Sequence, residues 1–164
     1  MASITDQTLY EAAAALGDRL EQTGMKLATA ESCTGGWIAK ALTDVPGSSA
    51  YLECGLVTYS NDAKQELLGV TPLSLDKHGA VSEAVVREMV IGALTATGAD
   101  IAVSVSGVAG PDGGTAEKPV GMVWFAWGRQ GEEPEAVCEQ FGGDRDSVRR
   151  QAVLFALQAV RGYL

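Results

Sequence analysis

The hydrophobic and polar positions of this chain switch repeatedly between helical and strand-like spacing. Residues 6–22 place leucines and alanines every three to four positions, which predicts an amphipathic helix capped by Asp6. Residues 100–107 are almost uninterruptedly apolar, which is typical of a central strand buried on both faces. The same reasoning predicts further helices at 36–45, 61–69, 71–79, 82–97 and 144–160, and further strands at 26–30, 53–60, 122–128 and 136–143.

The order of these elements indicates how the sheet is built. Helices alternate with strands over the first two thirds of the chain, which favours parallel pairing. The last two strands flank a short polar turn, which predicts an antiparallel pair. No repeat or linker interrupts the pattern. We therefore expect one α/β domain spanning residues 1–164, with a mixed sheet.

Composition and charge narrow the classes of function. The chain is 46% hydrophobic and 20% charged, as in folded proteins, and its net charge of -9 argues against nucleic acid as a partner. No apolar segment approaches the roughly 20 residues of a membrane span, and the start resembles no export signal. Three cysteines and one histidine fit no metal-ligand spacing. We expect a cytoplasmic protein without a membrane partner, a metal or another cofactor.

The stretch "ATAESCTGGW", residues 28–37, joins a predicted strand to a predicted helix through a glycine turn. Ser32 lies just before the helix and is a candidate nucleophile. The backbone N–H groups of Cys33, Thr34 and Gly35 could stabilise an oxyanion there. Two alternatives stay open at this point: the stretch is only a capped turn, or Cys33 is the nucleophile.

A serine nucleophile needs a base, and the sequence offers few candidates. The single histidine, His78, precedes a predicted loop, where a surface role is common. Lysine can act as a base when burial lowers its pKa. Tyr59 ends a predicted strand and Lys64 lies one turn into the next helix, so both can face the same loops. The alternative is that Tyr59 and Lys64 are ordinary solvated side chains.

Two further segments are candidates for substrate binding. A long glycine-rich loop follows the central strand at Ser106, and such loops in compact domains are usually functional. Arg145 and Arg149, four residues apart, share one face of the last helix and could hold a phosphate. The alternatives are a flexible surface loop and ion pairs with neighbouring aspartates. The candidate loop residues are Ser106, Gly107, Gly110, Gly113 and Gly114.

Four long blocks together resemble the C-terminal domain of the competence/damage-inducible protein CinA, whose stand-alone members are nicotinamide-nucleotide amidases. The match runs in order and nearly without gaps from about residue 26 to 155. The blocks are "TAESCTGGWIAKALTDVPGSSAYLECGLVTYSNDAK", "GAVSEAVV", "SVSGVAGPDGGTAEKPVGMVWFA" and "FGGDRDSVRRQA".

The resemblance implies a compact three-layer α/β/α sandwich with a mixed, mainly parallel sheet, usually in a homo-oligomer. It implies hydrolysis of the carboxamide of nicotinamide mononucleotide to nicotinic acid mononucleotide and ammonia, in pyridine nucleotide (NAD) salvage. Ser32 takes the place of the nucleophile, with Lys64 and Tyr59 as its activating partners. The alternative is a nucleotide-binding module that uses the same loop and arginines without hydrolysis.

Overall fold

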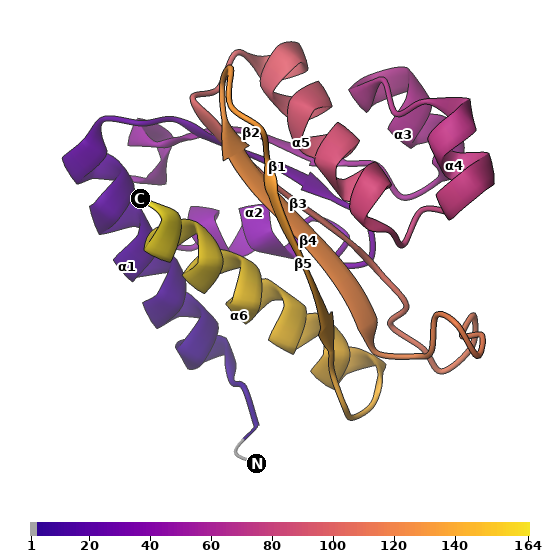
Figure 1. The fold of residues 1–164 in the computed structure, drawn as a ribbon. Coiled ribbons are helices and arrows are strands. Elements are labelled where there is room, and N and C mark those ends of the chain that lie inside the picture. Colours follow the sequence, from indigo (N-terminus) through magenta and orange to yellow (C-terminus); the bar gives the residue numbers. More distant parts are fainter. Residues whose placement is uncertain (1–2) are drawn as a thin grey trace.

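Within residues 3–164, the part of the chain that this computed structural model describes, five strands form one mixed sheet (Figure 1). Their order across the sheet is β2-β1-β3-β4-β5. The three strands β2, β1 and β3 pair in parallel, and β4 is antiparallel to both β3 and β5. Only β4 runs against the others, so the predicted mixed, mainly parallel sheet is confirmed. The strands are β1 (Leu27–Glu31), β2 (Leu52–Val57), β3 (Ile101–Gly107), β4 (Met122–Arg129) and β5 (Glu135–Gln140).

Helices cover both faces of the sheet, which gives the three layers expected from the resemblance (Figure 1). One face packs against α1 (Asp6–Thr23), α2 (Trp37–Thr43) and α6 (Arg145–Tyr163), and a 3-10 turn at Ser48–Ala50 precedes β2. The other face packs against α5 (Glu83–Thr97), with α3 (Asn61–Leu68) and α4 (Pro72–His78) beside it. None of the helices within residues 3–164 is both long and apolar enough to span a membrane.

The helix α5 lies close to the sheet and to α3 because small residues line both contacts. Ala28 of β1 and Ala102 of β3 are fully buried beneath it. At Gly92 of α5, a Cβ atom would lie 1.8 Å from the carbonyl oxygen of Leu68, so only glycine allows α3 to approach. This contact fixes α3, the helix that carries Lys64.

Side chains cap the helices much as the sequence predicts, with one correction. Ser60 accepts the N–H of Ala63 at the start of α3, and Asp144 accepts that of Ser147 at the start of α6. The cap of α1 is Thr5, not the predicted Asp6. Thr5 is still extended, whereas Asp6 is already the first helical residue, so only the Thr5 hydroxyl can reach back to the free N–H groups.

The parallel strands end together at one edge of the sheet. Beyond β1 and β2, the N–H of Thr58 donates to the Glu31 carbonyl oxygen at 2.9 Å. On the other side of β1, the N–H of Ser32 donates to the Val105 carbonyl oxygen at 3.0 Å. These bonds extend the sheet by one residue and bring the loops after β1, β2 and β3 to the same place, as ligand sites in α/β sheets require.

Candidate active site

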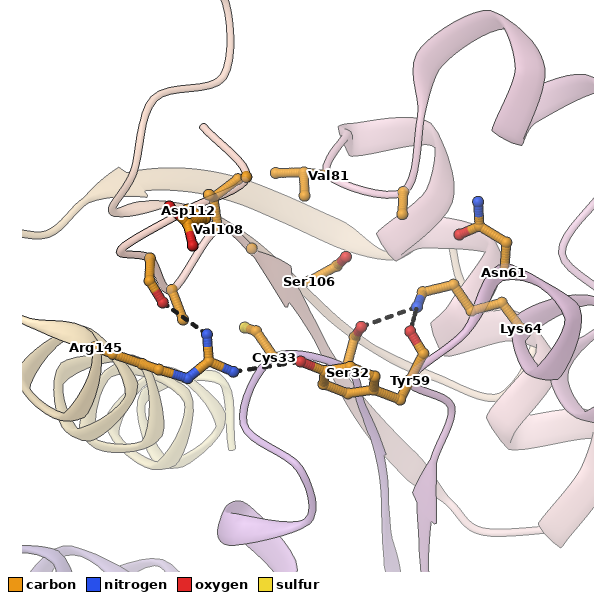
Figure 2. Close-up of a pocket in the computed structure, with 15 residues that line it drawn as sticks. Ser32, Cys33, Tyr59, Asn61, Lys64, Val81, Ser106, Val108, Asp112 and Arg145 are labelled. Atoms are coloured by element: carbon orange, nitrogen blue, oxygen red, sulfur yellow. Dashed lines mark hydrogen bonds between the residues drawn. The ribbon is translucent and has the colours of Figure 1, made fainter. Parts of the chain in front are cut away.

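A cavity of about 320 Å³ opens at this edge of the sheet (Figure 2). Its walls come from the turn after β1, the β2–α3 loop with the first turn of α3, the segment between α4 and α5, the end of β3 with the long loop after it, and the first turn of α6. Nine of the candidate residues line it: Ser32, Cys33, Tyr59, Lys64, Ser106, Gly107, Gly110, Gly113 and Arg145. Four candidates do not: Thr34, Gly35, Gly114 and Arg149.

Lys64 and Ser32 form the polar centre of the cavity (Figure 2). The Lys64 side chain is only 1% exposed, and its Nζ lies 2.9 Å from Ser32 Oγ. Two carbonyl oxygens also bind this nitrogen, that of Thr58 at 2.7 Å and that of Tyr59 at 3.1 Å. Burial lowers the pKa of Lys64 from 10.5 to about 8, because the charged form loses hydration.

This arrangement suits a neutral amine that acts on Ser32. A neutral amine has two N–H groups and one lone pair, whereas an ammonium has three N–H groups. The carbonyl oxygens of Thr58 and Tyr59 can only accept, so they take both N–H groups of the neutral form. The lone pair then faces Ser32 Oγ and can accept its proton. With a pKa of about 8, roughly a tenth of Lys64 is neutral at pH 7.

Glu31, for which the sequence suggested no role, closes the turn that carries Ser32. Its carboxylate is fully buried and accepts four hydrogen bonds. One oxygen accepts from the Thr34 hydroxyl at 2.6 Å and the Ile38 N–H at 2.8 Å. The other accepts from the Thr29 hydroxyl at 3.2 Å and the Ala39 N–H at 3.1 Å. Glu31 therefore supplies the cap that α2 lacks at its glycine N-terminus.

The amides of the turn divide into free and occupied groups. Among residues 3–164, no hydrogen-bond partner is found for the N–H groups of Cys33 and Thr34. Cys33 lines the cavity, so its N–H is available to an oxyanion, whereas Thr34 is fully buried and does not line the cavity. The Gly35 N–H instead donates to the Ser32 carbonyl oxygen at 3.0 Å. The expectation that all three amides are free is thus corrected to two, because the third closes the turn.

Arg149 supports the same turn from outside the cavity. Its guanidinium donates to the carbonyl oxygens of Cys33 at 3.1 Å and Thr34 at 3.2 Å, and it stacks on Trp37. The structure does not bring Arg149 to the cavity, which corrects the expectation that it lies beside Arg145. Arg145 lines the cavity, whereas Arg149 lines a separate hollow together with Gly35, Gly36 and Trp37.

Arg145 lies at the opposite end of the cavity from Lys64 (Figure 2). Its guanidinium donates to the Gly110 carbonyl oxygen at 2.7 Å and to the Tyr59 hydroxyl at 3.3 Å. The Tyr59 side chain is 63% exposed and points toward Arg145, so this tyrosine reaches Lys64 through its backbone carbonyl and not through its phenol. The resemblance implies Tyr59 as an activating partner, and within residues 3–164 its contact with Lys64 is made by the carbonyl oxygen and not by the phenol.

The glycines of the long loop allow close backbone packing. Gly110 has a φ of +84°, which side chains rarely adopt, and its carbonyl oxygen orients Arg145. At Gly114, a Cβ atom would lie 2.8 Å from the Val120 backbone nitrogen. Gly114 therefore closes the loop on itself and does not face the cavity, contrary to its expected role in binding.

Two rival candidates for the chemistry lose support. Burial raises the pKa of the Cys33 thiol to about 11, so the thiol stays protonated and is a poor nucleophile. His78 is exposed in the last turn of α4 and does not line the cavity. Among residues 3–164, no cluster of three or more His, Cys, Asp or Glu side chains is arranged to hold a metal ion.

The sequence did not single out Asn61 or Asp112, both of which line the cavity (Figure 2). Asn61 directly follows the Ser60 cap and precedes Lys64 by one turn, a spacing that could have indicated it. Asp112 lies within the long loop. The loop sequence has no periodicity, so it does not indicate which way the Asp112 side chain points.

The model of the CinA C-terminal domain matches residues 9–164. The chain belongs to this family. It is 55% identical over 157 residues to the nicotinamide-nucleotide amidohydrolase PncC of Escherichia coli (strain K12), covering 96% of this chain and 95% of that protein. It is 53% identical over 162 residues to the protein of the same name from Enterobacter agglomerans, covering 98% and 99% of the two chains.

Solved structures support the same family assignment. The competence/damage inducible protein CihA from Agrobacterium tumefaciens superposes with a TM-score of 0.92 at 40% identity, covering 99% of this CinA-family chain and 98% of that one. The resemblance noted from residue 26 to 155 thus extends over both terminal helices, α1 and α6.

Proposed function

We propose that this CinA-family protein hydrolyses the carboxamide of nicotinamide mononucleotide to nicotinic acid mononucleotide and ammonia. The names of the relatives, which cover almost the whole chain, support the reaction and the substrate. The observation that carries the chemistry is the buried Lys64 amine 2.9 Å from the Ser32 hydroxyl.

The reaction begins with activation of Ser32. Neutral Lys64 accepts the hydroxyl proton, and Ser32 Oγ attacks the carboxamide carbon to form a tetrahedral intermediate. The free N–H group of Cys33 donates to the oxyanion, with that of Thr34 next to it in the turn, and one such donor contributes about 2.7–4 kcal/mol in comparable sites. Glu31 and Arg149 hold the turn so that these amides need not reorganise.

The second half of the reaction releases both products. Protonated Lys64 passes the serine proton to the amide nitrogen, and ammonia leaves an acyl-enzyme on Ser32. Water then attacks the ester with Lys64 again as the base, which regenerates Ser32 and releases nicotinic acid mononucleotide. The amide and water supply every atom of the two products, and the scheme uses no metal or other cofactor.

The two ends of the cavity suggest how the nucleotide is oriented within it. Lys64 and Ser32 lie at one end and Arg145 at the other (Figure 2). The carboxamide therefore lies at Ser32, and Arg145 binds the 5′-phosphate while the loop from Gly107 to Gly113 lines the ribose. Tyr59 contributes its carbonyl oxygen to Lys64 and its phenol to Arg145.

The wider setting follows from the products. Nicotinic acid mononucleotide is a precursor for NAD, so the reaction serves pyridine nucleotide salvage. The cytoplasmic location and the homo-oligomer stay predictions from the sequence and its resemblance.

Ammonia release from nicotinamide mononucleotide tests the proposed function directly. The wild-type protein should produce ammonia and nicotinic acid mononucleotide in equal amounts, and Ser32→Ala should produce none above background. Cys33→Ala is the matched control, because it removes the neighbouring thiol and keeps the backbone N–H. Tight binding of the nucleotide without ammonia would instead identify a nucleotide-binding module, and loss of activity only in Cys33→Ala would identify a thiol enzyme.

A further inference from the structure

Ser106 is a nearly buried residue whose hydroxyl has no partner within the protein. The residue is 1% exposed and lines the cavity. It is the second-last residue of strand β3, just before the long loop. Within residues 3–164, no hydrogen-bond partner is found for its Oγ, which is not among the fully buried unpaired atoms and is therefore open to the cavity. Figure 2 shows this hydroxyl in the group that contains Ser32 and Lys64.

Ser104 shows what a structural serine in this strand does. It lies two residues earlier on β3, so both side chains point to the same face of the sheet. Ser104 is also fully buried, yet its hydroxyl donates to the Val86 carbonyl oxygen of α5 at 2.7 Å. Ser106 has no such hydrogen bond to α5 and lines the cavity instead. A hydroxyl that opens into the cavity and has no partner within the protein is free to bind a ligand.

The register of the strands brings Ser106 to the reacting group. Strand β1 pairs with β3 so that Ala30 faces Ser104 and Glu31 faces Val105. The next residue after Glu31 on the β1 side is Ser32, and the next residue after Val105 on β3 is Ser106, so these two serines lie opposite each other. Neighbouring strands are about 4.8 Å apart, so the two serines are adjacent at the base of the cavity.

We propose that Ser106 binds the nitrogen of the carboxamide and so selects an amide as the group to be cleaved. This inference rests on the proposed amidase function. The carboxamide oxygen is bound by the N–H group of Cys33, which can only donate. The amide nitrogen carries two N–H groups and needs an acceptor, and Lys64 already has its two carbonyl partners. The Ser106 oxygen accepts one of these N–H groups.

The contact does not alter the proton balance of the reaction. The proton of Ser32 still passes through Lys64 to the departing nitrogen. Ser106 keeps its own proton and holds the nitrogen in a fixed orientation, so that its developing lone pair faces Lys64. The loss of this single neutral hydrogen bond should lower kcat/KM by about fivefold to tenfold.

The test compares two substrates in one preparation: nicotinamide mononucleotide and the methyl ester of nicotinic acid mononucleotide. The ester has the same nucleotide but no N–H, and its alkoxy oxygen is a poor acceptor for the Ser106 hydroxyl. Ser106→Ala should lower kcat/KM for the amide by about fivefold to tenfold and for the ester by less than about twofold. The ratio of the two values is independent of the folded fraction, so partial misfolding of the variant does not affect it.

Two variants complete the experiment. Ser104→Ala removes a satisfied hydroxyl from the same strand and should leave the amide-to-ester ratio unchanged, even if it lowers stability. Ser106→Thr keeps a hydroxyl and should restore most of the ratio. An unchanged ratio in Ser106→Ala, or an equal loss on both substrates, overturns the inference, since equal loss means that Ser106 binds the ribose or phosphate. A wild-type protein that cleaves neither substrate overturns the proposed function itself.

Discussion

Replacement of Glu31 by glutamine should weaken both the fold and the catalytic turn. The substitution preserves shape and removes the negative charge and one acceptor oxygen. If the glutamine oxygen keeps its bonds to Thr34 and Ile38, its NH₂ group takes the place of the other carboxylate oxygen. The Thr29 hydroxyl can rotate and accept from this NH₂ group, but the Ala39 N–H can only donate and is left facing a donor.

The magnitude follows from that one unpaired amide and the lost charge. A buried donor without a partner costs about 1–3 kcal/mol, and hydrogen bonds to a charged acceptor contribute about 1.5–3 kcal/mol each. We therefore expect Glu31→Gln to lower the free energy of unfolding by about 2–3 kcal/mol. Because α2 and the turn share this carboxylate, kcat should fall by more than KM rises.

Denaturant unfolding and steady-state kinetics of the same preparation check this prediction. Asp44→Asn is the matched control, since Asp44 is an exposed carboxylate whose contact with Lys40 contributes little to stability. An unfolding free energy and a kcat of Glu31→Gln within error of Asp44→Asn would refute the reasoning that Glu31 holds the turn.

Other substitutions test the remaining parts of the site and the fold. Lys64→Arg should lower ammonia release at least about 100-fold, since arginine stays protonated and cannot act as the base. Arg145→Ala should raise KM for nicotinamide mononucleotide strongly and leave any turnover of free nicotinamide unchanged. Arg149→Ala should instead lower kcat and the melting temperature. Identical kinetic effects of the two variants would contradict their separate roles. Gly92→Ala should lower the melting temperature markedly, because its Cβ would lie 1.8 Å from the Leu68 carbonyl oxygen; an unchanged melting temperature would show that α3 can move away.

The resemblance implied the three layers and the pairing of Ser32 with Lys64, and the structure has these layers and places the two side chains together. Ser32 and Lys64 follow neighbouring parallel strands, and the carboxyl ends of such strands meet at one edge whatever the details of the loops. Periodicity also located the helices to within a few residues. The cap of α1 was misplaced by one residue because Thr5 and Asp6 are both good capping residues, and only the backbone conformation distinguishes them.

The parts of the site that depend on side-chain direction could not be predicted. Glu31 accepts from amides seven and eight residues later, which requires the path of the glycine turn to be known. Helical spacing places Arg145 and Arg149 on one face, but it does not reveal that Arg145 binds the long loop and Arg149 binds the β1 turn. The exposed ring of Tyr59 can turn toward Lys64 or Arg145 equally well on local grounds, and the sequence contains no information on that choice.

The pH dependence of kcat/KM for nicotinamide mononucleotide tests most directly whether Lys64 activates Ser32. The active form is neutral, and burial lowers the pKa of Lys64 to about 8, so activity should rise with pH and level off above that value. Below the midpoint the rise should approach tenfold per pH unit. A profile that is flat through pH 8, or that rises with the apparent pKa of about 6.5 typical of histidine, would contradict the assignment of Lys64 as the base.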